Sequence, residues 1–179
     1  LHIICGDCYS SFGINDVKGS VKIDVKGKTP NRCISLILYQ MLGGKVTTNY
    51  KFIDILNSIN NYIKQPLKDE LNMYTEPTII VNAKQSEIIL EKSYNINCDK
   101  ALILNVKSFI NHSKLLVKIL ELNLSDDFYS NGSIVSQTDI KINTSIFDTQ
   151  NGHITANNDI EIKAFKMKNS NSCITANNN

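Results

Sequence analysis

The chain has 179 residues, 42% hydrophobic residues and a formal net charge of +2. This length suits one ordinary domain or a run of stacked repeats. The near-neutral charge excludes the basic excess typical of nucleic-acid-binding proteins, and the hydrophobic content is too high for a disordered chain. No apolar run approaches the roughly 20 residues of a membrane-spanning helix.

The sequence opens with LHIICGDC, which has neither an initial Met nor the basic start of a signal peptide. This start, and an ending inside a repeat, suggest a piece of a longer protein. Cys5 and Cys8 form a C-x-x-C pair, which is half of a zinc site without a second pair and lacks the βαβ context of a redox motif. From the residues alone, a disulfide, two inert thiols and a metal or redox site all stay open. Cys33, Cys98 and Cys173 are expected to be single thiols.

Two segments of the first half carry periodic patterns. Residues 19–27 alternate, with Val21, Ile23 and Val25 on one side, which predicts a strand. Residues 51–71 have apolar residues at helical spacing, but they are rich in Ile, Asn and Tyr, which are weak helix formers. The pattern there fits an amphipathic helix and a set of short strands about equally.

A repeat of about 20 residues dominates the second half. The stretch NGHITANNDIEIKA at 151–164 is a loose copy of NGSIVSQTDIKINT at 131–144, and the copy begins again at 171. Alternating apolar triplets recur at 102–106, 120–124, 140–144 and 160–164. Alternation with a period of two indicates strands that bury one face. Fixed self-similarity of this length is typical of solenoids.

We therefore predict an all-β fold, a right-handed parallel β-helix with coils of about 20 residues and roughly nine coils in all. Stacked coils would bury a continuous ladder, made by Leu104, Leu122, Ile142 and Ile162. Asn131, Gly132, Asn151 and Gly152 are expected to form the corners, because Asn and Gly tolerate left-handed backbone conformations. An antiparallel sandwich also has short alternating strands, but it does not explain why the sequence repeats at intervals of 20 residues.

The remaining polar residues give no catalytic, cofactor or metal site. His2, His112 and His153 show no grouping with Ser or carboxylates, and we interpret the last two as solvated turn residues. Asp139 and Asp159 are 20 residues apart. Calcium binding would need a glycine-rich nonapeptide that is absent, and a glycosidase needs two carboxylates in one cleft. An Asx turn before each strand is the simpler interpretation. Asn-x-Ser triplets begin at residues 111, 123, 131 and 143, and we attach no glycosylation to them.

The repeats at 128–179 resemble those of the filamentous-haemagglutinin family, the large exoproteins of bacterial two-partner secretion. The family pattern N-x-G-x-I-x-A-x-x-D-L-x-L-x-A is closely matched from Asn151 to Ala164. In the first half, IICGDC followed by SSFGINDV is similar to the C-x-x-C segment of the family's secretion domain. The stretch from 43 to 77, which contains FIDIL and ELNMYT, is similar to the later part of that domain. The family's N-P-N-L element is absent, and only LHII remains of N-P-N-G-I.

The resemblance implies two parts, the end of a secretion (haemagglutination-activity) domain at 1–77 and β-helix repeats at 78–179. It also implies strands at 51–71 and a disulfide between Cys5 and Cys8. The implied function is the shaft of a secreted, cell-surface adhesin that carries a distal binding or toxin region. The implied partners are an outer-membrane transporter and the surface of a host or neighbouring cell. Alternatives are a transporter-recognition module, a β-helix carbohydrate-active enzyme and a non-functional gene remnant.

Overall fold

The structure is a computed structural model that describes residues 2–4, 11–17, 20–26, 34–35, 37–39, 42 and 77–178. The predicted pair Cys5 and Cys8, the single thiol Cys33 and the ambiguous segment 51–71 lie outside these residues. The predictions made for them, the disulfide included, therefore stay predictions.

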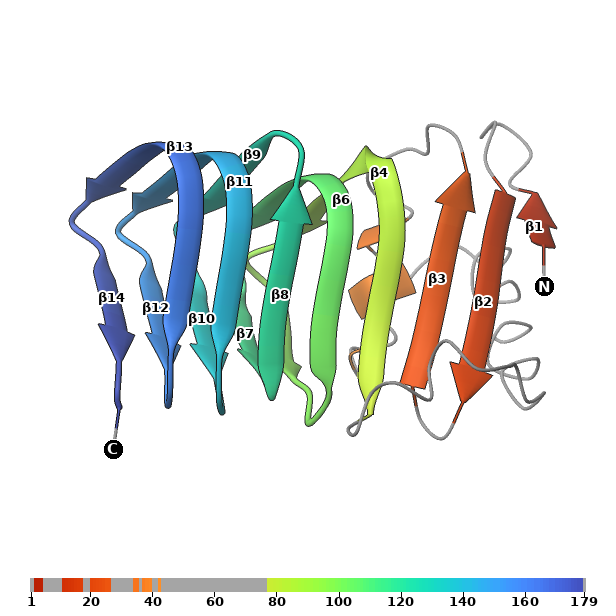
Figure 1. Cartoon of the computed structure of the whole chain (residues 1–179), viewed down its shortest axis with the longest axis horizontal. Coiled ribbons are helices and arrows are strands. Elements are labelled where there is room, and N and C mark those ends of the chain that lie inside the picture. Colours follow the sequence, from red (N-terminus) through yellow and green to blue (C-terminus); the bar gives the residue numbers. More distant parts are fainter. Residues whose placement is uncertain are drawn as a thin grey trace.

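The described strands belong to two sheets (Figure 1). The larger sheet contains β1 (His2–Ile4), β2 (Ser11–Val17), β3 (Ser20–Lys26), β4 (Thr78–Leu90), β6 (Ala101–Asn111), β8 (Ile119–Leu124), β9 (Asp127–Ser130), β11 (Ile140–Gln150) and β13 (Ile160–Ser170). The smaller sheet contains β5 (Asn95–Asn97), β7 (Lys114–Val117), β10 (Ser133–Ser136), β12 (His153–Ala156) and β14 (Cys173–Ala176). From β3 to β14, every pair of neighbouring strands is parallel.

The parallel strands stack in about five coils of roughly 20 residues, which confirms the predicted β-solenoid. In each coil a strand of the larger sheet runs along one side and bends over a corner, and the chain returns through the smaller sheet. In Figure 1 the near strands from β4 onward point upward, the chain passes behind, and the coils advance toward the C-terminal end, which is a right-handed turn. The third coil divides its long strand into β8 and β9, and both pair with β11.

The N-terminal strands depart from the prediction of roughly nine coils. The strand predicted at 19–27 is present as β3, which pairs in parallel with β4. However, β1 pairs with β2, and β2 with β3, in antiparallel orientation. The two strands are only two residues apart in the sequence, and Val17 at the end of β2 is paired with Ser20 at the start of β3. A connection this short closes a hairpin and cannot make a parallel crossover, so the coil count predicted from length was wrong.

Inward rows of side chains fill the solenoid from each of its sides. One row joins Ile79, Leu102, Leu120, Ile140 and Ile160 across successive coils. The smaller sheet contributes a second row: Ile96, Leu115, Ile134, Ile154 and Ile174. On the third side Phe109, Phe128 and Phe147 stack with ring centroids 6.1 and 4.8 Å apart, and all three are fully buried. The rows therefore form one continuous core.

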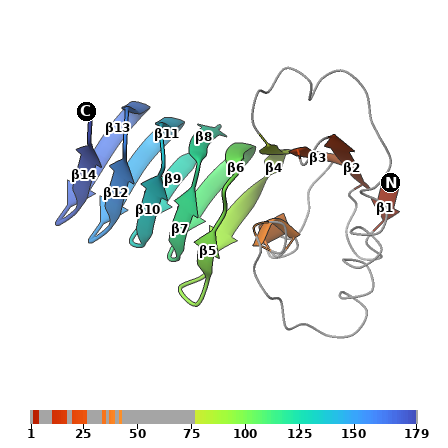
Figure 2. The same cartoon turned by 90° about the horizontal axis from the view of Figure 1, so that it is seen from below.

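A helical segment covers the N-terminal end of this core. Residues 34–35 and 37–39 are helical, and Figure 2 shows them beside β4 and β5 at that end of the stack. Ile34 and Leu38 are buried within the core cluster. The Ile89 amide of β4 donates a hydrogen bond to the Ser35 hydroxyl at 2.9 Å, and the rings of Tyr39 and Tyr94 stack with centroids 3.8 Å apart. The first coil is thus packed on both sides.

Candidate functional site

The most regular polar feature is a row of asparagines on the outer surface of the larger sheet. Asn82, Asn105, Asn123 and Asn143 follow the central inward residue of their strands and so point outward. Each amide nitrogen donates to the amide oxygen of the preceding coil, at 2.7 Å from Asn105, 2.9 Å from Asn123 and 2.8 Å from Asn143. We call these four residues the asparagine ladder. It crosses β4, β6, β8 and β11, which form the near side of Figure 1.

The ladder is polar along its length because all of its bonds run in one direction. At the N-terminal end the Asn82 amide donates to the carboxylate of Asp24 on β3 at 2.7 Å. At the other end the next residue in register is Lys163. The ladder therefore finishes on a carboxylate, which is the favourable charge for the amide hydrogens that point toward it. The ladder also ties the N-terminal strand β3 to the solenoid.

A groove of about 730 Å³ runs beside the ladder. It is lined by Asn82, Lys84, Asn105, Val106, Asn123, Leu124, Ser125 and Asn143. This volume lies in the range of small-molecule sites, which is about 300–1,000 Å³. One of the lining residues is charged, and the four ladder amides supply most of the polar groups.

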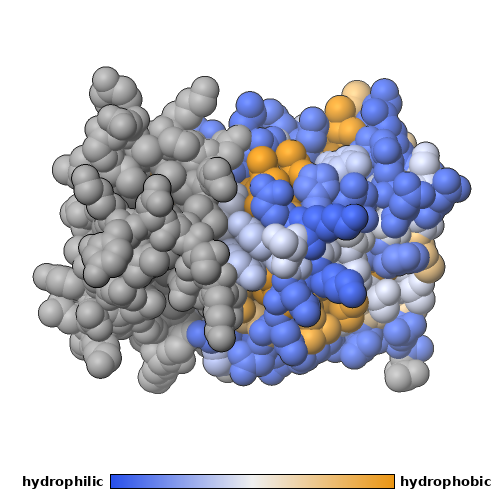
Figure 3. Space-filling view, turned by 180° about the vertical axis from the view of Figure 1, so that it is seen from behind, coloured by the Kyte–Doolittle hydropathy of each residue, from blue (hydrophilic) through white to orange (hydrophobic). Residues whose placement is uncertain are grey.

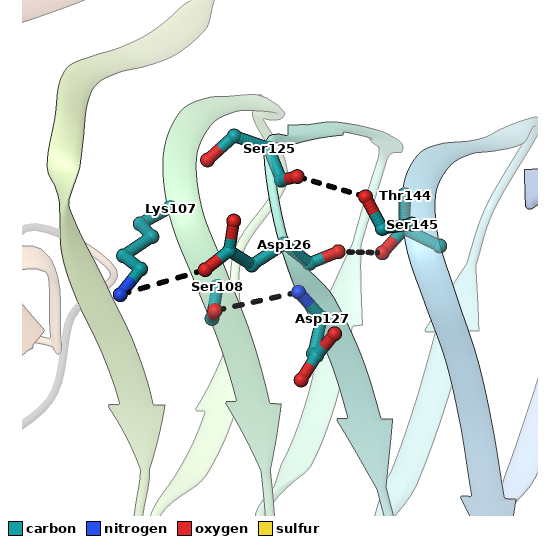
Figure 4. A network of polar contacts seen from close by, with 7 residues as sticks. All are labelled: Lys107, Ser108, Ser125, Asp126, Asp127, Thr144 and Ser145. Atoms are coloured by element: carbon teal, nitrogen blue, oxygen red, sulfur yellow. Dashed lines mark hydrogen bonds and ion pairs between the residues drawn. The ribbon is translucent and has the colours of Figure 1, made fainter. Parts of the chain in front are cut away.

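The corner that follows the ladder is braced by hydrogen bonds between coils (Figure 4). The Thr144 hydroxyl donates to the Asp126 carbonyl at 2.7 Å, and the Ser145 hydroxyl donates to the Ser125 carbonyl at 2.9 Å. The Lys107 ammonium lies 3.4 Å from the Asp126 carboxylate, and both side chains are about half exposed. A pair this exposed contributes little stability, so the backbone contacts fix the corner and with it the wall of the groove.

The structure brings the four residues of the predicted core ladder together in one column. Leu104 pairs with Leu122, Leu122 with Ile142, and Ile142 with Ile162. The first three are fully buried, whereas Ile162 in the last coil is partly buried. The asparagine ladder and the phenylalanine stack were not predicted. Their signal was present, because an Asn follows each of Val81, Leu104, Leu122 and Ile142, and the Phe residues recur at 19 residues.

The predicted corners are in place, but their residues act differently from the expectation. Among the described residues other than glycine, Asn151 and Asn171 have positive φ, at 55° and 51°, and Asn131 does not share it. Gly132 and Gly152 are required by close approach and not by a left-handed conformation. A Cβ on Gly152 would lie 2.8 Å from the Ser130 carbonyl oxygen, and one on Gly132 would overlap the Ser113 carbonyl oxygen. The small residue lets neighbouring corners stack.

The two histidines whose side chains are described have different surroundings. The Nδ1 atom of His112 is 2.7 Å from the Asn131 side-chain oxygen, and its ring is tilted against Tyr129. His153 is exposed at the start of β12 and is in register with Cys173. For His2, the structure describes the backbone in β1 and not the side chain.

The two aspartates join neighbouring coils. The Asp159 amide donates to the Asp139 carboxylate at 3.2 Å, and the Asn178 side chain donates to the Asp159 carboxylate at 3.1 Å. These bonds run between coils, whereas the expected Asx turn would have closed within one coil. Among the described residues, no group of three or more His, Cys, Asp or Glu side chains would hold a metal ion.

The described cysteines differ in environment. Cys98 and Cys173 are free thiols, the first buried and the second exposed. Burial raises the pKa of the Cys98 thiol, because desolvation disfavours the thiolate. The hydrogen bond and the positive charge of Lys163 lower the pKa of Glu161, whose carboxylate lies 2.6 Å from the ammonium on the surface of β13.

The far side of the molecule offers a contrasting surface. Figure 3 shows the described part of this face, which is largely hydrophilic with separate apolar patches. An outward column on the smaller sheet contains Asn95, Lys114, Ser133, His153 and Cys173, one from each coil. No side-chain ladder comparable to that of the larger sheet is found among these described residues.

Comparison with protein-family models, with curated proteins and with solved structures finds no match to this chain. Across the described part of the chain, none of the helical residues form a helix long and apolar enough to cross a membrane.

Proposed function

We propose that the chain is part of the shaft of a secreted, surface-exposed adhesin, which holds a distal binding or toxin region away from a cell surface. The observation that supports it is the unbroken parallel stack from β4 to β14, in which ten residue pairs of β11 and β13 keep one register. Parallel coils about 4.8 Å apart make a rod whose length grows with each repeat. A rod of this kind is a spacer.

The repeated sequence supports the same proposal. Each coil contacts its neighbours, so a solenoid folds progressively from one end and needs few contacts between distant parts of the chain. Such a chain suits export through a narrow pore followed by folding outside. The partners that accompany this proposal are an outer-membrane transporter of the two-partner type and the surface of a host or neighbouring cell.

A display experiment tests the shaft. The full chain is placed between a bacterial surface anchor and an antigen-binding module, and adhesion to cells that carry the antigen is counted. The control is Ile142→Asp, which buries a charge in the core and collapses the stack. At equal display, the native chain should give several-fold more adhesion than the control. Equal adhesion would reject the spacer role.

A distance measurement tests the rod directly. Spin labels are attached to Cys173 and to an Asn95→Cys variant, with the other cysteines replaced. These two positions end the outward column of the smaller sheet. Four coil steps predict one narrow distance of roughly 19 Å between the two backbones. A broad distribution would mean that the stack is not a stiff spacer.

A further inference from the structure

The groove beside the asparagine ladder has the chemistry of a binding surface. A side-chain amide has two hydrogens to donate and two lone pairs to accept. In the contacts of the described residues, Asn82 and Asn105 each use one hydrogen and one lone pair within the ladder. Their second donor and acceptor remain for water or a ligand. Asn123 uses its second hydrogen on Glu121 at 2.9 Å.

Strand β13, one coil beyond the last asparagine of the ladder, carries an exposed aromatic ring. Phe165 is 97% exposed, and it is the counterpart in the last coil of Ser145. Ser145 is hydrogen-bonded to Ser125, which lines the groove. Ser125, Ser145 and Phe165 therefore occupy equivalent corner positions in three successive coils. We call them the corner column. Ser145 is exposed although a coil lies on each side of it, so this position points to solvent and not into the core. The phenylalanine there offers a flat apolar face to a ligand.

The charge and the spacing of the groove define that ligand. Its lining is apolar over most of its area, with Val106 and Leu124 among its residues, and it carries four amides and one charged side chain, Lys84. It therefore suits an uncharged polymer whose units offer both apolar faces and hydroxyl groups. The amides recur at the strand spacing of about 4.8 Å, and three steps span about 14 Å. Each ring of an extended 1,4-linked glycan advances by a similar distance. An extended peptide repeats its side chains at about 6.6 Å on one face and falls out of step.

We propose that this groove binds an extended, uncharged 1,4-linked glycan, with its long axis parallel to the solenoid axis. Hydroxyls of successive sugars bond to successive ladder amides, and the apolar face of a terminal sugar packs on Phe165. This binding goes beyond the shaft role and does not depend on it, because the groove belongs to the isolated chain.

Calorimetric titration of the full chain with cellohexaose tests the proposal. We expect saturable binding with a dissociation constant on the order of 0.1–1 mM. Phe165→Ala removes only exposed surface and should leave the fold intact while weakening binding at least about fivefold, the effect of losing roughly 1 kcal/mol. Asn105→Ala should weaken it by a similar factor, whereas Asn95→Ala on the smaller sheet should leave it unchanged.

Three results would overturn the proposal. These are no saturable binding at about 10 mM cellohexaose, unchanged affinity in Phe165→Ala, and tighter binding of a polygalacturonate oligomer or an extended decapeptide than of cellohexaose. Circular dichroism of each variant shows that it is folded. The display experiment above uses an unrelated antigen as its target, so either proposal can fail while the other stands.

Discussion

The two ends of the coil stack are built from similar residues but differ in what lies against them. At the N-terminal end, β3 pairs with β4, and the helical residues Ile34 and Leu38 pack into the core. At the C-terminal end, β13 and β14 are paired on one side within the described structure. Met167 is 55% exposed there, although its counterpart Phe147 in the preceding coil is fully buried. Burial in this fold is supplied by neighbouring coils.

The largest loss of stability is expected when a core residue of an interior coil is truncated, and the same truncation in the last coil provides the comparison. Ile142→Ala leaves a cavity between packed coils and should lower the free energy of unfolding by about 2–5 kcal/mol. Ile162→Ala, in the same column but partly exposed, should cost roughly half as much. Urea denaturation of both variants measures the difference. Equal losses would mean that the last coil is packed as tightly as the interior.

The second prediction compares the residues that cover the two ends. Leu38→Ala removes a fully buried side chain from the covered end and should cost about 2–5 kcal/mol. Met167→Ala at the other end should cost about 1 kcal/mol or less, because its side chain is mostly in water. Thermal melts of the two variants measure this. A small effect at Leu38 would show that the helical segment does not stabilise the coils.

The third prediction concerns the asparagine ladder. Asn105→Ala breaks one hydrogen bond to Asn82 and one from Asn123, and should cost about 1–2 kcal/mol. Asn143→Ala breaks one ladder bond and should cost about 0.5–1 kcal/mol. A double-mutant cycle between the two positions measures cooperativity along the ladder. Strictly additive losses would argue against coupling through the aligned amides.

The smallest expected effect is a pH dependence carried by Cys98 near the covered end. Its folded-state pKa is raised by burial. The unfolded chain therefore loses this proton first, near pH 8.5. Stability from the group is fully present below that pH and is lost as the pH rises through the higher folded-state pKa. Cys98→Ala should reduce the loss of stability that the protein shows as the pH rises in alkaline solution.

The exposed Cys173 should be alkylated much faster than Cys98 at pH 8, as measured by peptide mass spectrometry.

Much of the solenoid could be predicted from the sequence because inward residues repeat in type as well as position. Leu104, Leu122 and Ile142 alternate with polar residues at nearly constant steps, and one buried face fixes a register. The corners could be located but not explained. Asn151 adopts the left-handed conformation, whereas Gly132 and Gly152 respond to carbonyl groups of the preceding coil. Those contacts exist only after the coils have stacked.

The groove could not be predicted for a related reason. Asn123 and Asn143 had the appearance of ordinary polar residues in Asn-rich sequence, and only the register of four strands makes them a ladder. Phe165 had no distinctive local pattern either, since the same corner column holds Ser125 and Ser145 in earlier coils. Ile34 and Leu38 cover the core through tertiary contacts that no periodic pattern in the sequence predicts.

The constant register between β11 and β13 has a genetic consequence. Ten residues of β11 are paired with the residue 20 positions later, from Ile140 with Ile160 to Gln150 with Ser170. An in-frame duplication of one repeat would insert a complete coil, with its core column and its corner already matched to both neighbours. Loss or gain of a single residue within a strand would turn apolar side chains to the opposite face. Such a gene changes length readily in whole repeats and poorly in single codons.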